Sequence, residues 1–362
     1  FFGANTGLPF LRNFEMLQEE LRTGGVGDST RGEKSENQPA LSIQYCPELA
    51  REQEFELFAR LSPGDRAEFS RNEEIKQAHQ DFLRDGQMRL DIFALRKDGT
   101  IEGELIAPLR PEIPTLKPGG KYLVEIVLRT LKVGHLFTQG TVDSNEVWVD
   151  VEARSGDRVI GRSGALDQAG TVDPWSHFVN ALVIDRHGNR IDRRNPQDIY
   201  VAAYNHQIPP GAGQVVHYLL DVPPDAVDPV QLTAKLQYRK FDRKYMEHVF
   251  REDKIPAPNL PITTMCEDTI TLPVEGGSAK VESAVVRIPE WQRWNDYGIG
   301  LLLEGEQSSG SEKGELRQAE EVFKKVVELG QGEGYANLAR IYFREKRLSD
   351  AVKALQAAAQ NT

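Results

Sequence analysis

The amino-acid sequence predicts a multidomain α+β protein in which helical segments flank a central antiparallel β-sandwich. Apolar residues recur at helical spacing up to about residue 86, alternate with a period of two from residue 88, and return to helical spacing from Trp291. The chain has 362 residues, whereas a single hydrophobic core stops growing near ~250–300 residues. We therefore expect a helical N-terminal segment at 1–86, the sandwich at 87–288 and tetratricopeptide-like helical hairpins at 289–362.

The N-terminal segment is predicted to contain three helices joined by loops. Apolar positions at helical spacing support helices over 11–21 and 72–83, while Pro47 and Pro63-Gly64 bracket another over 47–61. Residues 23–40 hold almost no large apolar side chain and are predicted to form a loop. The sequence starts at Phe1 without the basic-then-apolar pattern of a signal peptide, so we expect a processed chain or a piece of a longer one.

The central segment shows the period-two pattern and the frequent turns of an antiparallel β-sandwich. Met88, Leu90 and Ile92 alternate along the first strand, and Asp98-Gly99 is typical of a hairpin turn. Turn residues separate the later strands at short spacing, with no long helix between them. We expect those strands at 122–128, 147–153, 159–162, 177–184, 199–203, 215–222, 232–238, 267–273 and 280–286.

The C-terminal segment carries a helical repeat that fits tetratricopeptide positions. The best fit lies in its last unit, at Tyr335, Leu338, Ala339, Tyr342, Ala351, Leu355 and Ala358, and Ala319, Phe323 and Val326 repeat half of that pattern one unit earlier. We expect Tyr335 and Tyr342 to contact a protein partner on the concave face of the helices. Two units are fewer than the roughly three that a stable array needs. They therefore either pack on the sandwich or continue beyond Thr362, and we favour continuation.

Composition restricts the classes of function. The formal net charge of −11 argues against a nucleic-acid-binding protein, which needs a basic surface. No apolar run approaches the ~18–20 residues of a membrane span, so none is expected. The two cysteines, Cys46 and Cys266, exclude a disulfide-rich scaffold and any Cys-x-x-Cys-His haem attachment within the chain. Two separate buried thiols and one disulfide are both compatible with the sequence.

Several strings in the β region have a distinctive order. In that order they resemble the segment that follows the haem-binding part in large multihaem c-type cytochromes with C-terminal tetratricopeptide repeats, and residues 2–9 resemble the stretch that joins the two parts. The likeness covers roughly residues 1–360. The strings are Val133-Gly134-His135-Leu136-Phe137, Gly140–Trp148, Gly161-Arg162-Ser163-Gly164, Asp173-Pro174-x-x-His177-Phe178, Asp192-Arg193-Arg194-Asn195, Ile208-Pro209-Pro210-Gly211 and Tyr238-Arg239-Lys240-Phe241.

The resemblance implies a role in electron transfer outside the cytoplasm, in the periplasm or at the cell surface. The family's Cys-x-x-Cys-His motifs lie upstream, so haem c would be bound mainly by a missing part or by a partner chain. Family members usually carry Pro-Gly-Gly after the Gly-His-x-Phe element, whereas this chain has Thr138-Gln139-Gly140. The predicted function is a non-catalytic scaffold that packs against the haem-bearing domain or chain. Such a scaffold could also donate a distal histidine ligand.

Three histidines are candidate distal haem ligands. His135 is the strongest candidate, because a neutral imidazole can ligate iron and Gly134 leaves backbone room for a flat ring. His177 and His206 are weaker candidates. A purely structural role stays open for each of them, through a hydrogen bond to nearby backbone. His217 lies on an expected strand, where a structural histidine is favoured.

Two further clusters are candidate binding residues. Hard oxygen ligands at Asp143, Asn145, Glu146 and Asp167 are a weak candidate for Ca²⁺, but the spacing fits no EF-hand and turn formation is the favoured explanation. Basic and aromatic residues alternate from Arg239 and Lys240 to Tyr245. This stretch is a candidate docking face for an acidic partner or for haem propionates, or an ordinary solvated strand end.

Two other functions stay open. A carbohydrate-binding or hydrolytic sandwich protein with a helical partner-binding tail would need exposed aromatic platforms, for which Trp148, Trp175 and Tyr204 are candidates. A plain assembly protein would use every histidine structurally. The sequence holds no nucleophile elbow, Walker loop, dinucleotide fingerprint or His-Glu-x-x-His motif. Enzymatic activity is therefore not predicted, although paired carboxylates are compatible with so acidic a chain.

Overall fold

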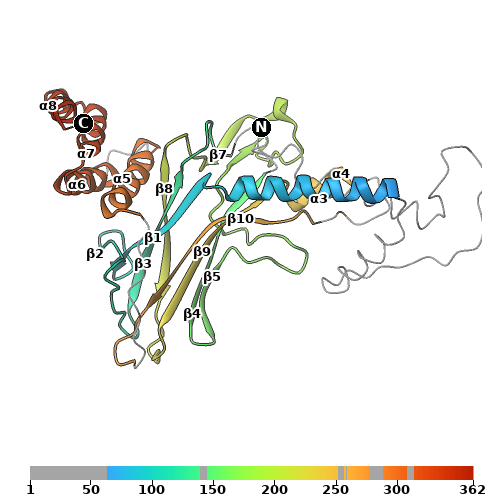
Figure 1. The fold of residues 1–362 in the computed structure, drawn as a ribbon, viewed down its shortest axis with the longest axis horizontal. Coiled ribbons are helices and arrows are strands. Elements are labelled where there is room, and N and C mark those ends of the chain that lie inside the picture. The colour runs from blue at the N-terminus through green and yellow to red at the C-terminus, as the bar shows by residue number, and fades with distance from the viewer. Residues whose placement is uncertain are drawn as a thin grey trace, which may run out of the picture.

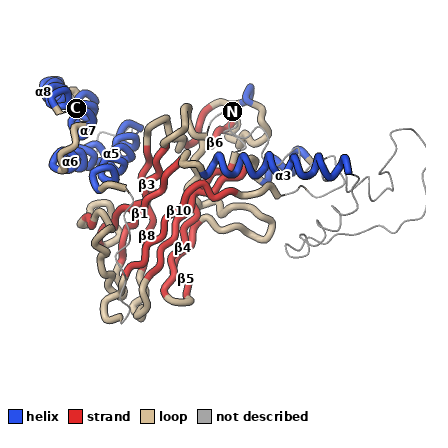
Figure 2. The backbone as a smooth tube through the Cα atoms, viewed as in Figure 1, coloured by secondary structure: helices blue, strands red, loops and turns tan. Residues whose placement is uncertain are grey.

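The computed structural model describes residues 63–138, 145–251, 257, 259–277, 288–307 and 314–361. Its strands form antiparallel sheets between an N-terminal helix and a C-terminal group of helices (Figures 1 and 2). This arrangement confirms the predicted α+β fold class. The expected helices over 11–21 and 47–61, the loop over 23–40, the strand over 280–286, Cys46 and Asp143 lie outside the described residues.

The sandwich is built from two four-stranded sheets. The first has the order β2-β1-β3-β8 and the second the order β10-β9-β4-β5, and neighbouring strands are antiparallel throughout. The first sheet consists of β1 (Met88–Lys97), β2 (Leu105–Ile106), β3 (Lys121–Thr130) and β8 (Gly213–Asp221). The second consists of β4 (Glu146–Ser155), β5 (Arg158–Ser163), β9 (Val230–Arg239) and β10 (Thr263–Leu272).

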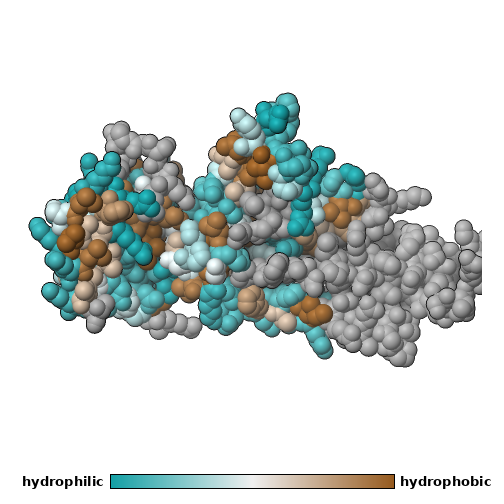
Figure 3. All heavy atoms as spheres, turned by 90° about the horizontal axis from the view of Figure 1, so that it is seen from above, coloured by the Kyte–Doolittle hydropathy of each residue, from teal (hydrophilic) through white to brown (hydrophobic). Residues whose placement is uncertain are grey.

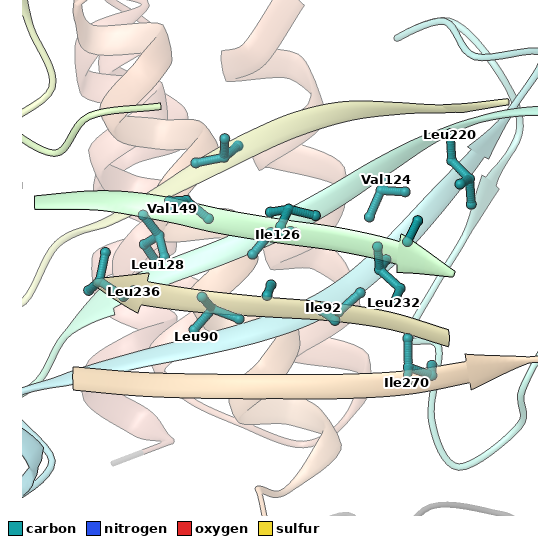
Figure 4. Packing of buried hydrophobic residues seen from close by; sticks show 14 of the residues in the cluster. Leu90, Ile92, Val124, Ile126, Leu128, Val149, Leu220, Leu232, Leu236 and Ile270 are labelled. Atoms are coloured by element: carbon teal, nitrogen blue, oxygen red, sulfur yellow. The ribbon is translucent and has the colours of Figure 1, made fainter. Parts of the chain in front are cut away.

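The space between the two sheets is filled by aliphatic side chains. Ile92, Ile126 and Leu128 come from the first sheet and pack in one cluster with Val149 and Leu236 of the second (Figure 4). All five are fully buried. Because side chains alternate across a strand, the residues at every second position of these strands point into the same layer.

The first sheet is also covered on its outer face. A register shift between Ile92 and Ala94 marks a β-bulge in β1, and Phe93 there joins a second core cluster with Val127 and Val215. Trp294 and Tyr297 from the C-terminal helices pack on Phe93, with ring centroids 5.0 and 4.7 Å away. The strand is therefore buried on both faces, which the simple alternation of its sequence did not predict.

Two helical hairpins form the C-terminal part. They consist of α5 (Glu290–Gln307) with α6 (Gly314–Glu328), and α7 (Glu333–Arg344) with α8 (Leu348–Gln360). Ala319, Phe323 and Val326 are buried at the expected repeat positions. Gly298 lies so close to Phe323 that a Cβ would approach its ring to 2.7 Å, which explains the small residue there.

The N-terminal helix and a small third sheet differ in part from their predicted bounds. Helix α3 spans Pro63–Arg84, so it begins nine residues before the predicted start at residue 72. Proline is well tolerated at the first position of a helix, and Pro63 was wrongly taken as a terminator. The third sheet pairs β6 (Ala181–Ile184) with β7 (Val201–Asn205), shorter than the strand expected at 177–184, and the 3₁₀ helix η1 (Pro196–Asp198) lies between them.

One short helix was not predicted. Helix α4 (Arg243–Val249) follows β9, and the Asp242 side chain caps it by accepting a 2.7 Å hydrogen bond from the Tyr245 backbone N–H. Asp242 is therefore an N-cap within a stretch that the sequence suggested to be a strand end. Of the helices that the structure describes, none is long and apolar enough to cross a bilayer.

Candidate functional site

An open groove of about 740 Å³ lies where the third sheet, strand β8 and the helices α5 and α6 meet. Its walls come from parts of the chain that are far apart in sequence, which only the fold brings together. The residues that give it chemical character are Trp175, His177, Tyr204, His206, His217 and Glu304. Two of the three histidines predicted as candidate ligands, His177 and His206, therefore share one groove.

Three aromatic rings form a stack along this groove. The His177 and His206 rings have centroids 4.7 Å apart and are inclined by only 11°. The Tyr204 ring stacks on the other side of the pair, 4.7 Å from His206. Its hydroxyl donates to the Asn180 side chain at 3.1 Å, which fixes the ring. Because Asn180, which is not part of the stack, fixes the Tyr204 ring, the stack is a preformed feature of the surface.

The groove keeps its paired imidazoles neutral. Burial lowers the pKa of His177 to about 4, and the neighbouring His206 adds to this effect. Burial also lowers the pKa of His206, against an opposing contribution from the Phe178 backbone. Both rings are therefore uncharged near neutral pH, which is the form of histidine that binds metal ions and haem iron.

The two stacked histidines differ in what their nitrogens contact. His177 Nε2 lies 3.0 Å from the Gln214 Oε1 atom and is engaged in that hydrogen bond. In His206, the buried Nδ1 makes no hydrogen bond of standard geometry to the described part of the chain. His206 Nδ1 is therefore a buried ring nitrogen without a standard hydrogen bond, in contrast to the engaged Nε2 of His177.

The third histidine of the groove belongs to a buried charge network. His217 lies opposite Glu125 in the pairing of β8 with β3, and its Nε2 is 3.2 Å from Glu125 Oε1. Burial lowers the pKa of His217, but the Glu125 carboxylate outweighs it and raises that pKa above its usual value. This agrees with the structural role that the sequence favoured for His217.

An acidic side chain from helix α5 completes the groove. Glu304 Oε1 accepts a 3.0 Å hydrogen bond from the Val215 backbone N–H. Burial raises the pKa of Glu304 to about 7, so a proton is gained or lost there near neutral pH. Sequence analysis did not single out Glu304, because 89 residues separate it from Val215 and no local pattern signals that contact.

His135, the leading sequence candidate, does not line the groove. It is half-buried in the loop after β3, and its Nδ1 lies 2.7 Å from the Leu136 backbone oxygen. That contact fits the alternative of a turn histidine. The adjacent Phe137 is buried in the main core, so the loop is anchored by its aromatic residue.

The candidate calcium ligands have other partners. Glu146 pairs with Arg239, whose Nε donates to Glu146 Oε2 at 2.6 Å, and Asn145 is buried beside it in sequence. Asp167 accepts hydrogen bonds from the Ala169 and Thr171 backbones, which is the turn role left open above. Within the described residues, no group of three or more histidines, cysteines or acidic residues is placed to hold a metal ion.

The prediction of a docking face at Arg239 and Lys240 is wrong. Arg239 is only 2% exposed because the register of β9 with β4 places it directly opposite Glu146. Lys240 is buried as well, and burial lowers the pKa of its amine. A buried arginine that pairs with a carboxylate belongs to the core and not to an exposed docking surface.

The other predicted residues occupy mixed environments. Tyr335 and Tyr342 are half-buried, and Tyr342 stacks under the Arg347 guanidinium at 4.2 Å, so its ring already has a partner. Trp148 is buried and donates to the Gly164 carbonyl, which removes it as a binding platform. Trp175, in contrast, is 91% exposed at the rim of the groove.

Cys266 is half-buried in β10, and burial raises the pKa of its thiol to about 12. The thiol is therefore protonated near neutral pH and is a poor nucleophile. Because Cys46 lies outside the described residues, the choice between two separate thiols and one disulfide stays a prediction.

Comparison with known proteins yields distant structural likenesses only. No family model and no curated protein matches the chain. A penta-heme cytochrome c552 from Thermochromatium tepidum aligns at 14% identity and a TM-score of 0.35, covering 54% of this chain and 41% of that one.

Two other solved structures align more weakly. The sporulation control protein Spo0M from Bacillus subtilis gives 10% identity and a TM-score of 0.21, covering 61% of this chain and 55% of that one. The alkylpurine DNA glycosylase AlkC from Pseudomonas fluorescens gives 7% identity and a TM-score of 0.18, covering 62% of this chain and 44% of that one. The chain thus spans about half or less of these proteins, and such TM-scores carry no argument about its fold or function.

Proposed function

We propose that this chain is a non-catalytic scaffold of an extracytoplasmic multihaem electron-transfer protein, and that the groove docks a haem-bearing domain or partner chain. The observation that supports it is the stacked pair of neutral imidazoles, His177 and His206, in an open groove of about 740 Å³. Flat aromatic walls suit the face of a planar macrocycle. A neutral imidazole on such a wall can complete the coordination of an iron that is carried by another domain.

The described residues fit such a group in their ring chemistry. His206 is the residue that would hold the iron, since His177 is engaged by Gln214 while the buried Nδ1 of His206 has no standard hydrogen bond. His177 and Tyr204, stacked on either face of His206, would orient its ring. When bound, haem c would supply one-electron chemistry, and this chain would supply position and ligation.

The polar groups of the groove favour binding over conversion. Glu304 accepts from the Val215 backbone, and His217 is paired with Glu125. These contacts engage one oxygen of Glu304 and one ring nitrogen of His217 within the fold, which supports a binding role for the groove. The helical hairpins would bind a protein partner through their concave face, as expected for short helical repeats.

Titration with microperoxidase-11, a soluble c-type haem peptide with an open axial position, tests this proposal. We expect the wild-type chain at pH 7.5 to convert the haem to a low-spin spectrum at micromolar to millimolar concentrations, and His206→Ala to lose at least tenfold in affinity. The matched control is His187→Ala, which removes an exposed histidine outside the groove.

Two results would contradict the groove assignment. One is a wild-type titration without any spectral change. The other is a loss of ligation in His135→Ala with His206→Ala unaffected, which would move the ligand to the loop after β3.

A second candidate function rests on Trp175. An indole that is 91% exposed beside a polar groove is a platform on which sugar rings stack, and Tyr204 and Glu304 line the same groove. In that case the chain is a carbohydrate-binding module. Titration with cellohexaose and xylohexaose should quench tryptophan fluorescence in the wild type and leave Trp175→Ala unchanged. Unaltered fluorescence with both oligosaccharides would exclude this candidate for β-1,4-linked chains.

A further inference from the structure

The last helix that the structure describes, α8, has an apolar face wider than the part that its neighbours bury. Ala351 and Ala354 of α8 are buried against its neighbours. Leu348, Val352 and Leu355 follow at helical spacing on another side and are 58%, 53% and 56% exposed. An apolar row exposed beside a buried one is a surface without a partner in the described chain.

We refer to these three residues, together with Phe343 at the end of α7, as the α8 stripe. Phe343 is 66% exposed on the neighbouring helix. Figure 3 shows apolar side chains gathered among hydrophilic ones at the end of the molecule that the C-terminal helices form. The repeat pattern predicted a packing role for Leu355, and its exposure is the clearest departure from that pattern.

The stripe continues an interface that the fold already uses. Helix α5 packs on α6, α6 on α7 and α7 on α8, so that each helix covers the apolar side of the one before it. The same succession would place the next covering element on the exposed side of α8. An amphipathic helix is the element that fits, because it presents apolar residues at the matching spacing.

The charges around the stripe indicate whether that helix should be acidic or basic. Residues 340–360 carry five basic side chains (Arg340, Arg344, Lys346, Arg347, Lys353) and two acidic ones (Glu345, Asp350), so their net charge is +3 within a chain of −11. Arg347 forms ion pairs with Glu320, Glu345 and Asp350, while Lys346 is exposed just before α8 and Lys353 is exposed on its polar side. A second copy of this chain would bring two such basic faces together and is disfavoured by repulsion.

We infer that the α8 stripe is the docking surface for an acidic amphipathic helix of another protein. Leucine-type side chains of that helix pack on Leu348, Val352 and Leu355, and its carboxylates meet the positive potential of the basic residues around α8, Lys346 nearest the start of the helix. Apolar contact supplies most of the affinity, and the charges set partner choice and association rate. This inference does not depend on the groove, which is formed by other residues.

Two designed 20-residue helices test it by fluorescence anisotropy. Both carry leucine at positions i, i+3, i+4 and i+7, and one has glutamate at the remaining positions where the other has lysine. We expect the acidic peptide to bind with a Kd on the order of 10 µM and the basic peptide to bind at least ~tenfold more weakly. Added salt should weaken the acidic peptide's binding, because the charges are exposed.

Variants separate the apolar from the charged contribution. Val352→Asp with Leu355→Asp should abolish binding of both peptides, while Lys346→Glu with Lys353→Glu should reverse the preference between them. The control is Val227→Asp, which changes an exposed valine elsewhere and should leave binding unchanged. Circular dichroism melting curves would verify that every variant is folded.

The inference is overturned by any of three results. The first is that neither peptide binds, and the second is that both bind equally well regardless of charge. The third is a dimer in light scattering that dissociates when Val352→Asp and Leu355→Asp are introduced. The last result would assign the stripe to a second copy of the chain.

Discussion

Replacing Glu125 with alanine is expected to lower the free energy of unfolding by about 3–5 kcal/mol, the cost of breaking a buried ion pair from one side. Glu125 is completely buried. Its Oε1 accepts from Arg96 Nε at 2.7 Å and its Oε2 accepts from the Tyr297 hydroxyl at 2.7 Å. Those two partners come from β1 and α5, so one carboxylate joins two strands of the first sheet to the helical hairpins.

The loss comes from what the substitution leaves behind. Arg96 is 7% exposed and cannot turn its charge to solvent without disturbing the sheet. Tyr297 is fully buried and would keep a hydroxyl with fewer partners. An uncompensated buried charge costs more than the net value of the pair that was removed.

Urea unfolding monitored by circular dichroism measures this effect. Glu104→Ala is the matched control, since Glu104 forms an exposed ion pair with Lys97 and should change stability by no more than about 1 kcal/mol. The double variant Glu125→Leu with Arg96→Met should recover much of the loss, because it removes both charges and keeps the volume. A Glu125→Ala protein as stable as the Glu104→Ala control would show that the network does not hold the helices to the sheet.

Acidification from pH 7 to pH 4.5 is expected to destabilise the groove through His177. The pKa of His177 is about 4 in the folded protein, against its usual 6.5, because burial and His206 disfavour the charged ring. The folded state therefore binds fewer protons than the unfolded state between these values. Stability from this group is complete above pH 6.5 and declines as the pH falls towards 4, by up to about 3 kcal/mol at 1.36 kcal/mol per pKa unit.

The variant His177→Phe isolates this contribution, since it keeps a ring in the stack and removes the titration. Relative to the wild type, its unfolding free energy should rise as the pH falls from 7 to 4.5, because the destabilising contribution of His177 is absent. His206, whose pKa is also lowered, gives a smaller effect of the same sign.

The titration of Glu304 has the opposite effect on stability. Burial raises its pKa to about 7, so its protonation favours the folded state as the pH falls from 7 to 4.5. The contributions of His177 and Glu304 are similar in size and opposite in sign, so Glu304→Gln should expose a decline in stability on acidification that the wild type largely offsets. Equal pH profiles for the wild type and His177→Phe would contradict the assignment of the decline to His177.

Much of the fold followed from local patterns in the sequence. The change to a period of two at Met88 agrees with the start of β1, and Asp98 and Gly99 both adopt positive φ in the turn that follows that strand. The apolar spacing of the last 70 residues predicted helices in the right places, with Phe323 and Val326 buried. Such features depend on neighbours within a few residues, which a single sequence displays.

The candidate site was predicted only in part. His177 and His206 were named as separate candidates, yet nothing in the sequence indicated that their rings stack or that Glu304 lies in the same groove. Arg239 was misjudged because its partner Glu146 is 93 residues away. The bulge at Phe93 was missed because the alternation of β1 is nearly regular on both sides of it.

By itself the sequence determined the class of fold, the order of the helical and sheet segments, and which residue types were available for binding. The tertiary structure alone decided which histidines face one groove, which cations are exposed and which side of the last helix stays uncovered. The physical reason is that periodicity and turn chemistry act over one or two turns of chain. Strand register and helix packing instead join side chains that lie tens to hundreds of residues apart.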